Sequence, residues 1–201
     1  MNTNSDEKKT VAHEVSIEEV AEQASLPDTP HSLSHLYAFQ KEIGHGAQGR
    51  IFQAIRLSDQ SQVVIKQLNI HSITTWKEYD LFHREAQVLQ KLNLQGVAKF
   101  YDAIDCLEDD PPCSYIIQEL IHGKTLQQML NESHRFTLEE IYDILIQTLR
   151  ILDELHSQRP PIIHRDIKPS NIMISPSFLF SIVSFPKCTR IRFKVFHSHF
   201  H

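Results

Sequence analysis

One short segment, His164-Arg165-Asp166-Ile167-Lys168-Pro169-Ser170-Asn171, holds the densest group of chemically active side chains in the sequence. A carboxylate such as Asp166 can accept the proton of a hydroxyl group. A lysine, Lys168, follows two residues later, and five residues after the aspartate Asn171 offers an amide oxygen to a metal ion. A random loop seldom offers this combination, so the segment is the strongest candidate for a functional loop.

Three glycines, Gly44, Gly46 and Gly49, stand within six positions, although the chain has only five glycines in all. Their spacing fits G-x-G-x-x-G. In a dinucleotide-binding unit such glycines open a helix and an acid follows about 20 residues later, but here a strand-like alternation follows and the position about 20 beyond Gly46 is Lys66. The pattern favours a turn between antiparallel strands, whose backbone amides can approach a polyphosphate. An ordinary hairpin turn stays open as the alternative.

A lysine, Lys66, ends the apolar run Val63-Val64-Ile65 on a strand that should be buried. Burying an ammonium group is costly unless it meets an anion. Nineteen residues later Glu85 lies in the helical stretch FHREAQVL and is a suitable partner. We therefore expect an ion pair that holds the ammonium group toward a phosphate. Taken singly, a solvated strand lysine and a surface acid stay open as alternatives.

Periodicity predicts the elements that must position these residues. Apolar and polar residues alternate in five segments, which we expect to be strands: FQKEIGHG, GRIFQAIRL, VVIKQL, KFYDAI and SYIIQEL. A helix is expected from about Thr75 to Leu92, and a longer one over 138–156, where Thr137 and Glu140 can form a capping box. The sequence therefore predicts an α+β fold.

In their order and spacing, the glycine turn, the lysine, the glutamate and the His-Arg-Asp loop resemble the eukaryotic-type protein kinases of the serine/threonine branch. Lys168 matches the lysine that tyrosine kinases lack. The resemblance covers about Tyr37 to Ile174. It implies a protein-kinase-like fold with a complete five-stranded N-lobe and one αC-type helix (37–118), a hinge (119–123), and only the first part of the mostly helical C-lobe (124–174).

The resemblance also implies a role for each matched residue. ATP would be bound by Gly44, Gly46 and Gly49 over the phosphates, Ile51 on the adenine, Val64 beside the lysine, Lys66 paired with Glu85, and the backbone of Glu119 and Ile121, with Gln118 as gatekeeper. Asp166 would orient the substrate hydroxyl, Lys168 would stabilise the transferring phosphoryl group, and Asn171 would hold one Mg²⁺. The implied function is phosphoryl transfer from ATP to protein serine or threonine. The alternative is a pseudokinase-like module that binds nucleotide or a protein partner.

The sequence departs from the family pattern where a second metal ligand is needed. Ser184-Phe185-Pro186 stands in place of Asp-Phe-Gly, and no Asp, Glu or Gly follows Asn171. A serine hydroxyl is a weak ligand for a hard cation, so the Mg²⁺ site is expected to be incomplete and the chain to have little or no kinase activity. We expect 175–201 to be an aberrant or disordered tail produced by truncation, a missed splice or a shifted frame. Alternating His197, His199 and His201 within it are a weak metal candidate.

Composition excludes several other classes of protein. With 41% hydrophobic and 22% charged residues, the 201-residue chain reads as globular. A net charge of -5 without a basic stripe gives no case for nucleic acid, and no apolar stretch approaches the ~18 residues that span a bilayer. Three cysteines without a C-x-x-C pair predict neither a disulfide framework nor a zinc site, which fits a reduced, cytoplasmic setting. Residues 1–36 read as a polar extension that can form a short helix over about 11–25.

Overall fold

The computed structural model describes residues 31–45, 49–176, 180–183 and 189–190. The helix predicted over about 11–25 therefore lies outside the described residues. The same holds for Gly46, for Ser184-Phe185-Pro186 and for the three alternating histidines near residue 200.

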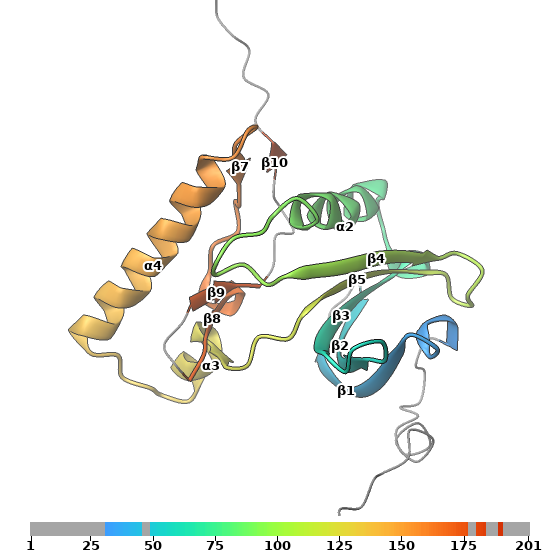
Figure 1. Cartoon of the computed structure of the whole chain (residues 1–201), viewed down its shortest axis with the longest axis horizontal. Helices are drawn as coiled ribbons and strands as arrows, with labels where there is room; N and C mark the ends of the chain where they lie inside the picture. Colours follow the sequence, from blue (N-terminus) through green and yellow to red (C-terminus); the bar gives the residue numbers. More distant parts are fainter. Residues whose placement is uncertain (1–30, 46–48, 177–179, 184–188, 191–201) are drawn as a thin grey trace, which may run out of the picture.

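A single antiparallel sheet forms the first half of the structure (Figure 1). All five predicted strands are present, in the spatial order β1-β2-β3-β5-β4. Their bounds are β1 Tyr37–His45, β2 Gly49–Arg56, β3 Gln62–Asn69, β4 Phe100–Cys106 and β5 Cys113–Glu119. The predicted five-stranded N-lobe is confirmed.

The sheet is covered on both faces, and β5 shows how its residues divide between them. Tyr115 and Ile117 join a cluster with Phe52, Val63 and other residues of β1 to β3. Ile116, between them in sequence, faces the other way and packs in a second cluster with the helices. Because side chains alternate along a strand, the two covered faces bury both sets of β5 side chains, and the strand is buried from Cys113 to Gln118 although Ser114 and Gln118 are polar.

Two helices match the two that periodicity predicts. Helix α2, Trp76–Leu89, lies along the β4–β5 end of the sheet, and α4, Leu138–His156, stands on the far side of β8 and β9 (Figure 1). The predicted capping box begins α4: the Thr137 hydroxyl accepts from the Glu140 N–H at 3.2 Å, and the Glu140 carboxylate accepts from the Thr137 N–H at 2.7 Å. Nowhere in the described ranges is a helix both long and apolar enough to cross a bilayer.

Short elements complete the described structure. They are the 3-10 helices η1 His31–Leu33, η2 Ile70–Ser72 and η3 Pro169–Asn171, the helix α3 Leu126–Asn131, and the strands β6 Lys124–Thr125, β7 Ile162–Ile163, β8 Ile172–Ile174, β9 Phe180–Ile182 and β10 Thr189–Arg190. Strand β7 pairs with β10, and β6, β8 and β9 form a three-stranded sheet. Helix α3 is not among the predicted elements, although Thr125 and Gln128 form a T-x-x-Q capping box at its start.

The fold continues beyond the boundary that the sequence predicts at Ile174. Strand β9 pairs antiparallel with β8, and Ile182 is only 1% exposed within the cluster that joins α2 to α4. Its N–H donates to the Gly96 carbonyl at 2.7 Å, and Val97 forms a parallel bridge with it. Part of the segment predicted as an aberrant tail is therefore packed into the core.

Candidate functional site

The glycine turn joins β1 to β2, as the sequence predicts. Gly44 lies opposite Ile51 in the antiparallel register of these strands. At Gly49 an added Cβ would stand 1.8 Å from the Gln67 carbonyl oxygen of β3, whereas at Gly44 it would meet only the Ile51 side chain, at 3.3 Å. The sheet itself therefore requires a glycine at position 49, whatever the turn binds. Gly44 has no such backbone constraint.

An ion-pair network supports the base of this turn. The Arg50 guanidinium contacts the Glu42 carboxylate at 2.7 Å, and His45 Nδ1 lies 3.2 Å from it. The hydrogen bond from Arg50 is the main reason why the pKa of Glu42 is lowered from its ordinary value. Through Glu42 the network links β1 to Arg50 of β2, close in sequence to residues 46–48, which the structure does not describe.

Lys66 lies on β3 and Glu85 on α2, and their side chains meet. Lys66 Nζ stands 2.7 Å from Glu85 Oε1, with the two side chains 15% and 6% exposed. The predicted ion pair is therefore present, and it places the charge of each residue against its partner where water is largely excluded. The same Nζ donates to the Val183 carbonyl at 3.0 Å. We did not predict this contact, but Val183 directly precedes the Ser184-Phe185 pair that stands in the place of the family's metal motif.

A second cluster forms around Asp166. Asn171 Nδ2 donates to the Asp166 backbone carbonyl at 2.8 Å and to its Oδ2 at 3.0 Å, and Lys168 Nζ lies 3.0 Å from the same oxygen. Asp166 N–H donates to His164 Nδ1 at 3.2 Å. Between them Arg165 has a φ of 62°, a left-handed conformation that costs about 1 kcal/mol or more for a residue with a side chain. The loop is thus held in one shape by hydrogen bonds around its aspartate.

The end of β5 carries the predicted adenine-side residues. Gln118 lies opposite Val64 of β3 and is only 2% exposed. Within the part of the chain that the structure describes, neither Nε2 nor Oε1 of Gln118 has a hydrogen-bond partner. Glu119 N–H donates to the Lys99 carbonyl at 2.8 Å, and Glu119 and Ile121 line a hollow of about 610 Å³.

These residues fit a nucleotide better than they fit a metal ion. The buried amide of Gln118 offers a donor and an acceptor to the polar edge of a base, and the buried Lys66 ammonium group suits a phosphate. By contrast, no group of three or more His, Cys, Asp or Glu side chains in the described ranges could hold a metal ion. Asn171 contributes one neutral amide oxygen, whereas Mg²⁺ is usually bound through carboxylates. The described residues therefore do not form a protein-held Mg²⁺ site.

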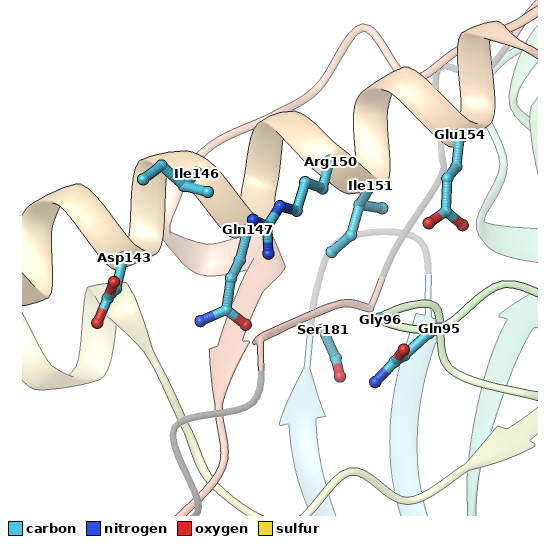
Figure 2. Close-up of a pocket in the computed structure, with 9 residues that line it drawn as sticks. All are labelled: Gln95, Gly96, Asp143, Ile146, Gln147, Arg150, Ile151, Glu154 and Ser181. Carbon is cyan, nitrogen blue, oxygen red and sulfur yellow. The ribbon is translucent and has the colours of Figure 1, made fainter.

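Another groove lies apart from all of these residues. It has a volume of about 490 Å³ and runs between α4 and the Gln95–Gly96 turn, with Ser181 of β9 at its floor (Figure 2). Its α4 side carries Asp143, Arg150 and Glu154 as well as apolar side chains. No residue with a predicted role lines it.

Comparison with known proteins agrees with the geometry. Residues 37–195 match the protein kinase domain family. Serine/threonine-protein kinase PknA of Mycobacterium tuberculosis is 29% identical over 155 residues, which cover 77% of this chain and 36% of PknA. Stress-activated protein kinase alpha of Dictyostelium discoideum is 27% identical, with 90% of this chain and 30% of that protein covered. A probable serine/threonine-protein kinase PknB of Corynebacterium glutamicum is 30% identical, with 71% and 22% covered.

The chain thus spans about a third or less of the length of these relatives. Proteins of this family generally use ATP and Mg²⁺ and act on protein substrates. Because the family match covers well over half of the 201 residues, and the relatives are serine/threonine kinases by name, the chain belongs to the protein kinase family, in its serine/threonine branch.

Proposed function

We propose that this chain provides the ATP-binding lobe and the phosphoryl-transfer loop of a serine/threonine protein kinase, and that by itself it transfers phosphate slowly or not at all. The observation that carries the proposal is the buried ion pair between Lys66 and Glu85. It connects the sheet to α2, and it holds the ammonium group ready for a negatively charged ligand.

The chain's own residues would divide the work between binding and transfer. Lys66, oriented by Glu85, binds the α- and β-phosphates, and Gly44, Gly46 and Gly49 supply the glycine-rich segment that covers the phosphates in this family. Ile51 and Val64 supply apolar surface for the adenine, and the Glu119 carbonyl and Ile121 amide bind its polar edge. When bound, ATP supplies the phosphoryl group that is to be transferred.

The loop around Asp166 would perform the transfer. Asp166 orients the substrate hydroxyl and accepts its proton, and Lys168, 3.0 Å from Asp166 Oδ2, neutralises charge on the phosphoryl group. Asn171 holds Asp166 in place through two hydrogen bonds. Asn171 would also offer its amide oxygen to one Mg²⁺. The family's second metal ligand, the carboxylate of Asp-Phe-Gly, is missing, because Ser184 stands in its place.

Thermal unfolding with and without ATP tests the nucleotide site. We expect ATP to raise the Tm of the unaltered chain, and Lys66→Met to abolish that rise. Lys41→Met on β1 removes an exposed lysine and is the matched control, which should keep the rise. Because Lys66→Met leaves the Glu85 carboxylate buried, the double variant Lys66→Met/Glu85→Gln guards against simple loss of folding. A shift that survives unchanged in a folded Lys66 variant contradicts the assignment.

The pseudokinase-like alternative is favoured by the apolar face of α4 that Leu138, Tyr142 and Leu149 leave exposed. Transfer assays separate this alternative from the enzyme. Because the unaltered chain is itself expected to transfer slowly or not at all, stabilisation by ATP supports a binding module only where transfer to a generic basic protein stays absent in Ser184→Asp as well. Ser184→Asp would restore the carboxylate of the family motif, so we expect it to make the ATP shift Mg²⁺-dependent. Ser198→Asp changes the charge equally and should not. If Ser184→Asp has no effect, the incomplete metal site is not what limits the chain.

A further inference from the structure

Two cysteines face each other across neighbouring strands. Cys106 ends β4 and Cys113 begins β5, and the antiparallel register makes them direct partners. Directly opposite residues in such a ladder have Cα atoms about 4.5 or 5.5 Å apart, depending on the hydrogen-bonding pattern. Both values fall within the roughly 4.4–6.8 Å that a disulfide requires. The backbone therefore needs no rearrangement to bring the two sulfur atoms together.

Their side chains also point to the same side of the sheet. Cys113 is 1% exposed and belongs to the core cluster around Phe52, and Cys106 is half-buried and packs against that cluster. Both thiols are free in the structure. Direct pairing across the strands and a shared face of the sheet place the two thiols next to each other.

The two thiols have different surroundings, which suit them to different roles in an oxidation. Burial is the main reason why the pKa of Cys106 is raised, with a smaller opposing effect from a hydrogen bond with Ser32. Cys106 is the one with some access to solvent. Cys113 accepts from Gln67 Nε2 at 3.2 Å and donates to the Pro111 carbonyl at 3.3 Å, so two hydrogen bonds fix the position of its sulfur.

We propose that Cys106 and Cys113 are a redox modification site and form a reversible disulfide when the chain meets a peroxide. The Cys106 thiolate attacks one oxygen of hydrogen peroxide, the O–O bond breaks, and a sulfenic acid and hydroxide result. The Cys113 thiolate then attacks the sulfenic sulfur and displaces a second hydroxide. The two hydroxides combine with the two thiol protons as water, and the peroxide is reduced by two electrons. A small thiol reductant reverses the bond by exchange.

The disulfide would tie β4 to β5 at the mouth of the loop over 107–112. Because the strands are already paired there, the folded chain changes little, whereas the unfolded chain loses freedom. The closed loop is short, so the stabilisation is at the low end of what disulfides give. We expect a rise in Tm of a few degrees, roughly the effect of other modest stabilising changes.

Mass spectrometry of the full chain carrying Cys188→Ser tests the pairing, since only the two cysteines in question remain. Both lie on one tryptic fragment, residues 100–124, because no Lys or Arg separates Lys99 from Lys124. After peroxide treatment we expect this fragment to lose about 2 Da, the mass of two hydrogens, and to resist alkylation. Cleavage at the acidic residues between Cys106 and Cys113 should leave two linked pieces. Addition of dithiothreitol should restore the original mass and the alkylation.

Two controls make the result decisive. The first is Cys106→Ser, which should show no loss of mass and no rise in Tm with peroxide. The second is the pH dependence of pairing in the Cys188→Ser chain. Its rate should increase with pH, because the raised pKa of Cys106 keeps thiolate scarce at neutral pH. The proposal is overturned if peroxide leaves Cys106 as an unlinked sulfinic acid. It is equally overturned if the link forms between two chains, or if Tm rises in Cys106→Ser as well.

Discussion

The apolar residues of the sheet and those of the long helix α4 differ in their exposure to solvent. Phe52, Val63 and Ile65 in the sheet are 0% exposed. On α4, by contrast, Leu138 is 67%, Tyr142 55% and Leu149 54% exposed. One chain therefore contains a unit whose apolar surface is covered and a helix of which one apolar face is not covered by the described residues. Contiguous exposed apolar residues commonly mark an interaction surface or an aggregation hazard.

One apolar face of α4 stays uncovered because the helix carries two apolar stripes rather than one. Thr148, Ile151 and Leu155 face the molecule and are buried, and Ile144 packs against the cluster of β8. The exposed residues recur at helical spacing on another face: Leu138, Ile141, Tyr142, Leu145 and Leu149. Packing therefore covers only one side of α4, whereas the central sheet is covered on both faces.

The comparison predicts its largest effect for a truncation in the sheet. Phe52→Ala removes a ring that packs edge-on against Phe39, with centroids 5.3 Å apart, and should lower the free energy of unfolding by about 3–5 kcal/mol. Leu145→Ala on the exposed face of α4 is the matched control and should change it by about 0.5 kcal/mol or less. Urea denaturation measures both. Equal losses would show that α4 is packed in solution.

Gln118 is the exception within the covered unit, and replacing it should raise stability. Its amide is buried without a hydrogen-bond partner among the residues described, so Gln118→Met removes an unpaired polar group at nearly constant volume. We expect a gain of about 1 kcal/mol in the absence of nucleotide. Gln118→Glu, which buries a carboxylate, should instead be destabilising. A Gln118→Met chain that unfolds earlier than the unaltered one would mean that the amide is satisfied in solution.

Polar substitutions on the uncovered face should change association rather than stability. Leu145→Gln with Leu149→Gln removes apolar surface at two exposed positions, so we expect less self-association in light scattering and weaker binding of a hydrophobic dye. The free energy of unfolding should move by about 0.5 kcal/mol or less per site. Ile151→Gln, on the buried face, is the contrasting control and should destabilise the chain. Unaltered association would show that this face does not drive it.

The smallest effect concerns the start of α4 and depends on pH. Glu140 accepts a hydrogen bond from the Thr137 N–H, which holds its pKa below the ordinary value of 4.5. The stabilisation is therefore fully present above about pH 4.5 and is lost as the pH falls through the lower pKa of the folded state. Circular dichroism should show a slightly lower Tm for the unaltered chain at pH 3 than at pH 6. In Glu140→Gln this part of the pH dependence should disappear.

Much of the fold could be predicted because local pattern and tertiary environment agree. The five strands alternate, and α4 has both a capping box and a long apolar repeat. The partnership of Lys66 with Glu85 followed from the cost of burying a charge together with the family resemblance. The strand alternation and the capping box can be recognised within short segments. The order of the family motifs can be recognised without knowing how the chain packs.

The features that escaped prediction depend on contacts between distant segments. Strand β9 follows a region without Asp, Glu or Gly, and its place in the core depends on Ile182 meeting Gly96. The contact between Lys66 and Val183 spans 117 residues. The pairing of Cys106 with Cys113 depends on the register of two strands, which spacing alone does not reveal. Among these features only α3 has a local sequence signal, the capping box of Thr125 and Gln128 at its start.

The hydrogen bond between Ile182 and Gly96 connects the two halves of the molecule at a point remote in sequence from the chain crossing at 119–123. The halves also meet through the hydrogen bond from Lys66 to the Val183 carbonyl and through the buried cluster that joins α2 to α4. Contacts away from the crossing restrict the directions in which the halves can rotate about it. A change near residue 182 would therefore alter both the relative motion of the halves and, through the neighbouring Val183, the surroundings of Lys66.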